Sequence, residues 1–371
     1  MIPVNTPLLD GNERKYLLEC IDTGWISSEG PFVTRFESEF SRTVGRLHGI
    51  AVANGSAALD VAVQAARIGP GDEVILPTFT IISPVASILR AGARPVFVDS
   101  DSLTWNMDVD QLETKITPRT KAILVVHIYG LPVDMDPVLD VAQRHNLLVI
   151  EDAAEMHGQT YRGKPCGSFG QLSTFSFYPN KHITTGEGGM VVTDDGSLAE
   201  RCRSLRNLCF QPQRRFVHEE LGWNYRLTNL QAAVGLAQLE RLSQHVAIKR
   251  ALGARYQSLL QPLQAFIQLP HVAMDFAENI YWVFGVLLRD SVPFDATEAM
   301  RRLGQRGIGT RPFFWPMHEQ PVLRDMGVVS ADARYPVAER MARRGFYLPS
   351  GLGLSEGEQE LVAAELRSIF Q

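Results

Sequence analysis

The residues best suited to chemistry in this chain stand where apolar runs end, and the first group is Ala53–Ala58. Gly55 lets the backbone approach a ligand closely, and Ser56 can cap the helix that follows. The N-terminus of that helix would attract an anion such as a phosphate group. An ordinary N-cap turn explains the same residues, so this segment alone leaves both interpretations open.

The second group follows the apolar run Leu147–Ile150, which leads directly into Glu151 and Asp152. A carboxylate at the end of a buried strand is costly unless it meets a cation or hydrogen-bond donors. The protonated ring nitrogen of a pyridine cofactor would be one such cation. A nearby arginine in a structural ion pair would be another.

The third group is Ser173–Gly189, where Lys181 lies between a hydroxyl-rich apolar segment and a glycine-rich turn. Desolvation there would lower the pKa of Lys181 and help it form a Schiff base with an aldehyde. The alternatives are a solvated surface lysine and, for the neighbouring His182, a packed core side chain. Together the three groups offer partners for the phosphate, ring nitrogen and aldehyde of one cofactor, pyridoxal 5′-phosphate.

The elements that must position these groups follow an order of strand, helix, strand. The expected strands are Val74–Leu76, Val96–Val98, Ala122–Val126, Leu147–Ile150 and Met190–Val192, with helices at Ser56–Arg67 and Pro137–His145 between them. The strands show almost no alternation of polar and apolar residues, which is typical of strands covered on both faces. The pattern predicts an α/β domain with a mainly parallel, doubly wound sheet, whose ligands bind at the carboxyl ends of the strands.

The C-terminal part of the sequence predicts a smaller α+β domain. From Thr228 an amphipathic stretch predicts one helix of about 20 residues. The further expected elements are a hinge at Gln261–Pro270, a strand at Tyr281–Arg289, a helix at Ala296–Arg306 and a last helix with a capping box of Ser355 and Glu358. We therefore divide the chain into a large domain, residues 1–248, and a small C-terminal domain, residues 249–371.

Composition excludes several classes of protein. The 371 residues carry a net charge of −5 and no basic run, so nucleic acid is not an expected partner. No apolar stretch is long enough to span a membrane, and the first residues do not form a secretory signal. The four cysteines contain no CxxC pair, which favours reduced thiols in a cytoplasmic protein without a metal site.

Five segments resemble the nucleotide-sugar aminotransferases of the DegT/DnrJ type, which have the aspartate-aminotransferase-like fold (fold type I) of pyridoxal-phosphate enzymes. These segments are Asp22–Phe32, Gly71–Pro77, Glu151–Ala154, Ser173–Gly189 and Gly222–Asn229. The resemblance covers nearly the whole chain. It implies an α/β large domain with a small C-terminal domain, pyridoxal 5′-phosphate as cofactor, and transfer of an amino group to a keto sugar.

The resemblance also implies roles for single residues. Lys181 would be the catalytic lysine that bonds to the cofactor, Asp152 would pair with the pyridine nitrogen, and Glu155 would lie beside the 3-hydroxyl group. Gly55, Ser56 and Ser176 would hold the phosphate, and Asn224 would reach it from the partner subunit of a homodimer with shared active sites. Ile81 stands where the family commonly has an aromatic residue on the cofactor ring, so the stacking contribution is lost. Trp25, Phe313 and His318 would border the sugar.

Within the family, the segment from Asn180 to Gly189 is most similar to the perosamine synthases. This similarity implies GDP-4-keto-6-deoxy-D-mannose as acceptor and L-glutamate as donor, with a UDP- or dTDP-linked keto sugar as the alternative. Related 3-dehydratases carry histidine in place of Lys181, which makes dehydration without amino transfer the less favoured reaction. A non-catalytic regulator that binds the cofactor is a third alternative.

Overall fold

The computed structural model describes residues 1–211 and 213–371, and its centre is a seven-stranded sheet. In spatial order the strands are β1 (His48–Val52), β9 (Gly189–Thr193), β8 (Leu172–Ser176), β5 (Leu148–Asp152), β4 (Thr120–Val126), β2 (Glu73–Pro77) and β3 (Arg94–Val98). Strand β9 is antiparallel to both of its neighbours, and the other neighbouring pairs are parallel. The expected α/β class with a mainly parallel sheet is confirmed.

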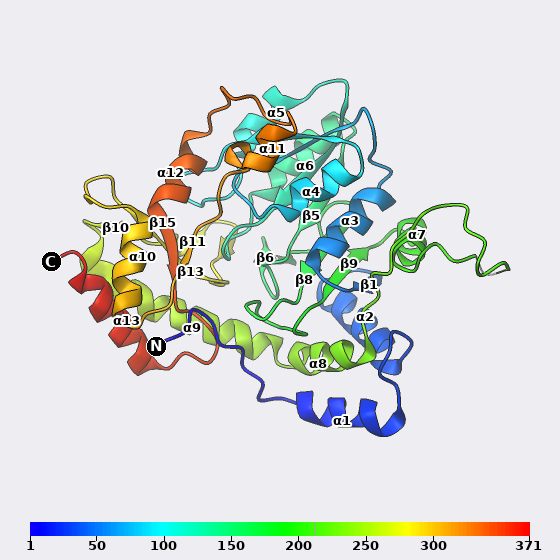
Figure 1. Ribbon diagram of the computed structural model, residues 1–371, viewed down its shortest axis with the longest axis horizontal. Coiled ribbons are helices and arrows are strands. Elements are labelled where there is room, and N and C mark those ends of the chain that lie inside the picture. Colours follow the sequence, from blue (N-terminus) through cyan, green and yellow to red (C-terminus); the bar gives the residue numbers. More distant parts are fainter. Residues whose placement is uncertain (212) are drawn as a thin grey trace.

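Helices cover both faces of this sheet (Figure 1). One face packs on α3 (Gly55–Ala65), α4 (Ser83–Arg90) and α7 (Gly196–Arg206). The other face packs on α2 (Pro31–Thr43), α6 (Met135–Arg144) and α8 (Asn229–Leu239). Successive strand residues alternate between two buried cores, since Ile50 and Val52 belong to the first and Ala51 to the second. Both faces are apolar, so the strands lack a two-residue period in the sequence.

The region after Thr228 forms two helices, so the prediction of one helix of about 20 residues is wrong. Helix α8 is followed by Glu240 and Arg241, and α9 (Leu242–Leu260) begins after them. Arg241 has φ −105° and ψ 0°, outside the helical range. Glu240 accepts hydrogen bonds from two side chains of the N-terminal segment. The apolar pattern continues across this break and gives no sign of it.

The C-terminal part contains a second, antiparallel sheet with its own core. Its strands are β10 (Ile267–Gln268), β13 (Phe284–Leu288), β15 (Gly345–Leu348) and β14 (Arg311–Pro312), and its helices include α10 (Ala296–Gln305), α12 (Pro336–Arg344) and α13 (Glu356–Ser368). The capping box of Ser355 and Glu358 is confirmed. The expected strand at Tyr281–Arg289 is shorter, because only Phe284–Leu288 pair with neighbouring strands. The proposed boundary between residues 248 and 249 falls inside α9 and stays a prediction.

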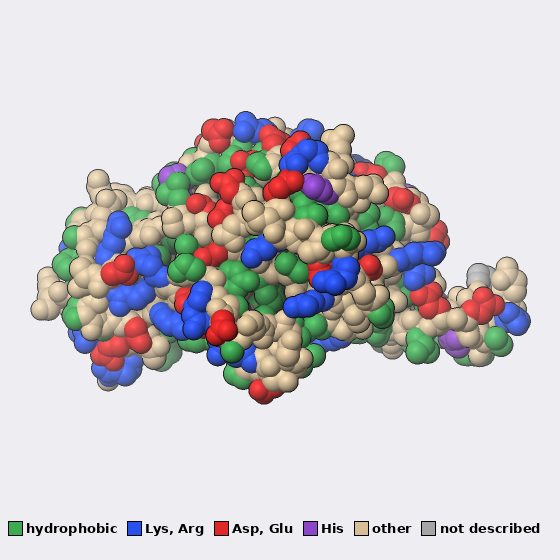
Figure 2. All heavy atoms as spheres, turned by 90° about the horizontal axis from the view of Figure 1, so that it is seen from above, with side chains coloured by type: hydrophobic (Ala, Val, Ile, Leu, Met, Phe, Trp, Pro, Cys, Tyr) green, Lys and Arg blue, Asp and Glu red, His purple; other side chains and the backbone are tan. Residues whose placement is uncertain are grey.

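The remaining elements lie within these two parts or between them. They are α1 (Glu13–Thr23), α5 (Leu112–Lys115), α11 (Pro321–Asp325), β6 (Thr160–Tyr161), β7 (Lys164–Pro165), β11 (Ala273–Met274), β12 (Ala277–Glu278) and the 3₁₀ turns η1 (Val109–Gln111), η2 (Gln261–Leu263) and η3 (Met317–Glu319). Acidic and basic side chains are interspersed over the face shown in Figure 2. Within the described residues, no helix has the length and apolar character needed to cross a membrane.

Candidate active site

A cavity of about 580 Å³ lies at the carboxyl ends of strands β4, β5 and β8. It brings together most of the predicted cofactor residues, although they are far apart in the sequence. These residues are Gly55, Ser56, Ile81, Asp152, Glu155, Ser176 and Lys181. The position matches the rule that ligands of open α/β sheets bind beyond the carboxyl ends of the strands.

One end of the cavity is built to receive an anion. The first turn of α3 lies so close to the end of β8 that a Cβ atom on Gly55 would be 2.7 Å from Cβ of Ser176. The hydroxyl groups of Ser56 and Ser83 are 2.7 Å apart at the same end. The expected cap by Ser56 is replaced by Asn54, whose side chain accepts a hydrogen bond from the amide of Ala57 (2.8 Å). A helix N-terminus with hydroxyl groups around it fits a phosphate group.

Asp152 is the last residue of β5 and is only 4% exposed. Its Oδ1 accepts a hydrogen bond from the amide of Ala154 (3.1 Å). Burial raises the pKa of Asp152 above its ordinary value. In the described part of the chain no arginine pairs with Asp152, so the structural ion pair that the sequence left open is not found. A buried carboxylate that faces a cavity in this way fits a protonated pyridine nitrogen.

Lys181 is buried rather than solvated, since 9% of its side chain is exposed. Its Nζ lies 4.0 Å from Oε1 of Glu155 and 3.7 Å from the ring centroid of Trp282. Burial lowers the pKa of Lys181, and it raises the pKa of Glu155 to about 8. The other oxygen of Glu155 accepts a hydrogen bond from the amide of Tyr129 (2.7 Å). A lysine with a lowered pKa has the nucleophilic amine that an aldehyde requires.

His182 is a packed core side chain, which is the alternative that the sequence left open. Its Nε2 donates to the carbonyl oxygen of Ile280 (3.2 Å), and burial lowers its pKa to about 3, so the ring is neutral. His127 lines the cavity and was missed by the sequence analysis. It follows the apolar run at β4 directly, which is the same signal that identified Asp152. Trp282 was also missed, and no local motif marks it, whereas Arg311 begins the segment of Phe313 and His318 that the resemblance places at the sugar, and it lines the cavity.

Four predicted site residues lie outside this cavity. Asn224 is exposed in the segment between α7 and α8. His318 is fully buried, with Nδ1 2.9 Å from the hydroxyl of Thr78 and Nε2 3.0 Å from a carboxylate oxygen of Glu339. Both ring nitrogens are engaged, so within one chain His318 joins the C-terminal part to the large sheet and does not border the cavity.

Phe313 is also buried behind the cavity. Its ring centroid lies 4.7 Å from that of Tyr129, and the neighbouring Phe314 lines the cavity instead. Adjacent side chains of an extended segment point in opposite directions, which explains why only one of the two phenylalanines reaches the cavity.

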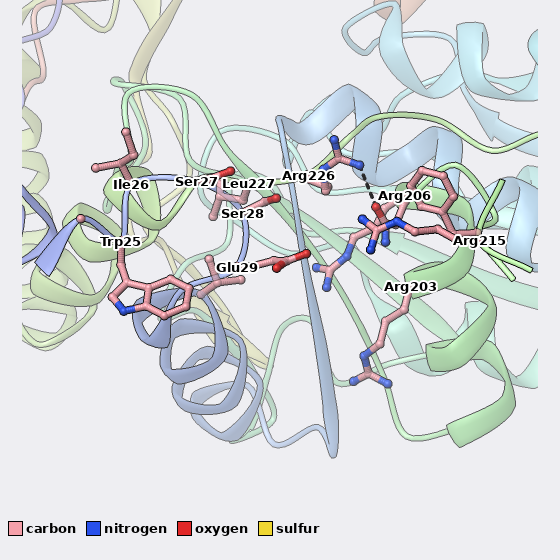
Figure 3. Close-up of a pocket in the computed structure, with 14 residues that line it drawn as sticks. Trp25, Ile26, Ser27, Ser28, Glu29, Arg203, Arg206, Arg215, Arg226 and Leu227 are labelled. Carbon is pink, nitrogen blue, oxygen red and sulfur yellow. Dashed lines mark hydrogen bonds between the residues drawn. The ribbon is translucent and has the colours of Figure 1, made fainter. Parts of the chain in front are cut away.

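Trp25, the fourth of these residues, lines a second cavity of about 710 Å³. Figure 3 shows four arginines on the side of this cavity opposite Trp25. They are Arg203, Arg206, Arg215 and Arg226. Arg206 pairs with Glu37, and Arg226 donates to the side chain of Asn207 (2.7 Å). The concentration of guanidinium groups favours an anionic ligand.

Comparison with known proteins identifies the family. Residues 7–367 match the DegT/DnrJ/EryC1/StrS aminotransferase family. The chain belongs to this family. It is 47% identical to a GDP-perosamine synthase of Caulobacter vibrioides and 42% identical to one of Escherichia coli O157:H7, over 100% of this chain and 98% of each relative.

Solved structures agree with this assignment. DesV of S. venezuelae has a TM-score of 0.89 at 36% identity, covering 97% of this chain and 94% of its own. The aminotransferase TlmJ of Streptoalloteichus hindustanus has a TM-score of 0.92 at 30% identity, covering 99% and 98%. The chain is therefore an enzyme with the expected aspartate-aminotransferase-like fold. The expected cofactor of this aminotransferase family, pyridoxal 5′-phosphate, is confirmed.

Proposed function

We propose that this aminotransferase converts GDP-4-keto-6-deoxy-D-mannose to the 4-amino sugar GDP-perosamine, with L-glutamate as amino donor. The observation that carries the chemistry is the buried Lys181, which shares one cavity with two carboxylates and an anion-binding helix N-terminus. The choice of sugar is supported by the two relatives named GDP-perosamine synthase. The alternative substrate is a UDP- or dTDP-linked keto sugar.

In this proposal each residue of the cavity has its own role in amino transfer. Bound pyridoxal 5′-phosphate supplies an electron sink for the α-carbon of the donor. Asp152 keeps the ring nitrogen protonated, and Gly55, Ser56 and Ser176 hold the phosphate. Glu155 lies on the side of the 3-hydroxyl group. Lys181 anchors the cofactor and then moves a proton at its Nζ, for which a lowered pKa is an advantage near neutral pH. Ile81 packs on the ring without aromatic stacking.

We further propose a homodimer with shared active sites. Asn224 cannot serve the cavity of its own chain, because it is exposed outside that cavity. The loop between α7 and α8 extends away from the body of the molecule (Figures 1 and 2), and Asn224 pairs with Asn207 at its base. In a dimer, Asn224 would reach the phosphate in the partner's cavity, and the arginine-lined cavity would meet the diphosphate of the sugar nucleotide.

A cytoplasmic location is supported by four cysteines that are buried and unpaired.

The deciding experiment is an assay of GDP-, UDP- and dTDP-linked 4-keto-6-deoxy sugars with glutamate, with the amino carbon of each product located by NMR. We expect kcat/KM for the GDP-linked ketone to exceed the others at least tenfold, which is roughly 1.4 kcal/mol. Equal or reversed preference would assign the enzyme to another sugar nucleotide.

Two further readouts separate amino transfer from the other reactions. The yellow colour of the enzyme should bleach with glutamate and recover with 2-oxoglutarate. A 3-deoxy product without nitrogen would indicate a dehydratase, and absence of any product would favour a regulator.

A further inference from the structure

The indole ring of Trp282 covers the amino group of Lys181 inside the cavity. Nζ of Lys181 lies 3.7 Å from the ring centroid, and Trp282 itself is buried. A desolvated ammonium group over the face of a tryptophan gains a favourable cation–π interaction. Glu155 is the carboxylate nearest to Nζ, at 4.0 Å, and burial raises its pKa to about 8. Near neutral pH that carboxyl group is largely protonated, whereas the indole face is available at every pH.

Trp282 is held in this position by contacts from separate parts of the chain. Its indole Nε1 donates a hydrogen bond to the carbonyl oxygen of Asn180 (2.9 Å), directly before the lysine. Its own carbonyl oxygen accepts a hydrogen bond from Nζ of Lys249 on α9 (2.8 Å). The preceding residue, Tyr281, has φ +50°, a conformation that costs energy for a side chain of this size.

Lys249 is a buried lysine that the proposed reaction does not use. It is 3% exposed, and its Nζ also donates to the carbonyl oxygen of Ser350. No carboxylate pairs with it in the described part of the chain, and burial lowers its pKa to about 7. Burying a lysine without a carboxylate partner costs free energy, because its ammonium group loses its water. Its contacts tie α9 to the backbone of Trp282 and to the segment after β15.

We propose that the Lys181 amino group packs against the ring of Trp282 whenever it is not joined to the cofactor. In this proposal Lys249 is the positioning residue that holds the ring in place. The assignment rests on the proposed role of Lys181 as the lysine that bonds to the cofactor. It gives the lysine a defined position during the half of the reaction in which the cofactor carries the amino group.

The test is ¹⁹F NMR of the full-length protein with 5-fluorotryptophan at its five tryptophans. Trp282→Phe assigns the resonance of residue 282. We expect this resonance to show a pH-dependent step in the cofactor-free protein and with pyridoxamine phosphate. The contribution of Lys181 to this step should be absent with pyridoxal phosphate and in Lys181→Met, so the step should be clearly smaller in both. Trp315 is the matched control, because it faces Arg343, whose charge does not titrate in this range (5.2 Å), and its resonance should stay constant.

Other titratable groups around Lys181 could also shift this resonance. They are Asp152, Glu155, His127, His182, Tyr178, Tyr347, Arg311 and Lys249. All of them remain in Lys181→Met, so the part of the step that this variant loses belongs to Lys181, and a step of unchanged size in the cofactor-free variant overturns the role of Trp282. A step of unchanged size with pyridoxal phosphate means that Lys181 is not joined to the cofactor, which contradicts the proposed function instead.

Lys249→Met tests the positioning role. We expect the Trp282 resonance to move and the part of its step that is lost on adding Lys181→Met to shrink at least twofold, while circular dichroism shows a folded protein. If this variant does not fold, Lys249→Gln keeps one hydrogen-bond donor and serves in its place. An unchanged resonance and an unchanged step in the folded variant would overturn the role of Lys249.

Discussion

Lys181, Asp152 and Glu155 share one buried cavity, and the same loss of water shifts the ionisation of all three. Burial raises the pKa of both carboxyl groups and lowers that of the lysine, so each is pushed toward its neutral form. A ligand with a ring cation and a phosphate would change this balance, since the ring nitrogen stabilises the charged form of Asp152.

Removal of Lys181 tests the site most directly. We expect Lys181→Ala to lose turnover by several orders of magnitude, because among the residues that the structure describes no other lysine lines the cavity. The visible absorbance that comes from the bond between lysine and cofactor should disappear with it. Lys164→Ala is the control, since Lys164 is exposed on β7 and should retain full activity. Steady-state transamination by Lys181→Ala would contradict the assignment.

Glu155 makes stability depend on pH in a defined direction. Its pKa is raised from 4.5 to about 8 in the folded protein, so the folded state binds more protons than the unfolded state between these values. Stability of the cofactor-free protein should therefore fall as pH rises from about 4.5 to 8. Glu155→Gln keeps an acceptor for Tyr129 and removes the ionisation. We expect urea denaturation to show this variant more stable by roughly 1–3 kcal/mol at pH 8.5, and no difference at pH 5.

At the scale of elements, the contact between α3 and β8 shapes the anion site. In Gly55→Ala the new Cβ would lie 2.7 Å from Ser176, so the helix and the strand end must separate. We expect at least tenfold weaker binding of pyridoxal phosphate, measured by fluorescence titration, with the fold retained. Gly304→Ala is the control, because apart from its own helix backbone no atom of the described residues lies within 4 Å of the new Cβ, and it should gain up to about 1 kcal/mol of stability in α10. Equal affinities in the two variants would show that the phosphate binds elsewhere.

Some of these elements could be predicted from the sequence, and others could not. The strands before Asp152 and Lys181 were predictable, because buried apolar runs and the residues at their ends are local features. The break between α8 and α9 was not, since it accompanies contacts of Glu240 and Arg241 with residues more than 220 positions away. Trp282 reaches Lys181 only through the fold. His318 is embedded in packing that no local pattern reveals, and the resemblance alone placed it at the sugar.

At the scale of the whole molecule, the segment between α7 and α8 that carries Asn224 exposes large apolar side chains, and Trp25 is exposed as well. Phe216 is 81% exposed and Leu221 89% exposed in the segment that carries Asn224, and Trp25 is 52% exposed. Large exposed apolar side chains can mark a surface that another protein chain covers. A second copy of the chain would cover them and would place Asn224 at a phosphate.

Shared sites make a prediction that separate sites do not. Neither Lys181→Ala nor Asn224→Ala homodimers should be active, but a mixed dimer has one site in which both residues are intact. Random exchange of subunits should therefore restore roughly one quarter of wild-type activity. The control is a mixture of Lys181→Ala with Asp152→Asn. These two residues line the cavity of the same chain, so every site in that mixture carries a defect and activity should not recover. If the first mixture stays as inactive as its parents while sedimentation shows that the subunits have exchanged, each chain must complete its own site and Asn224 has no role across the interface.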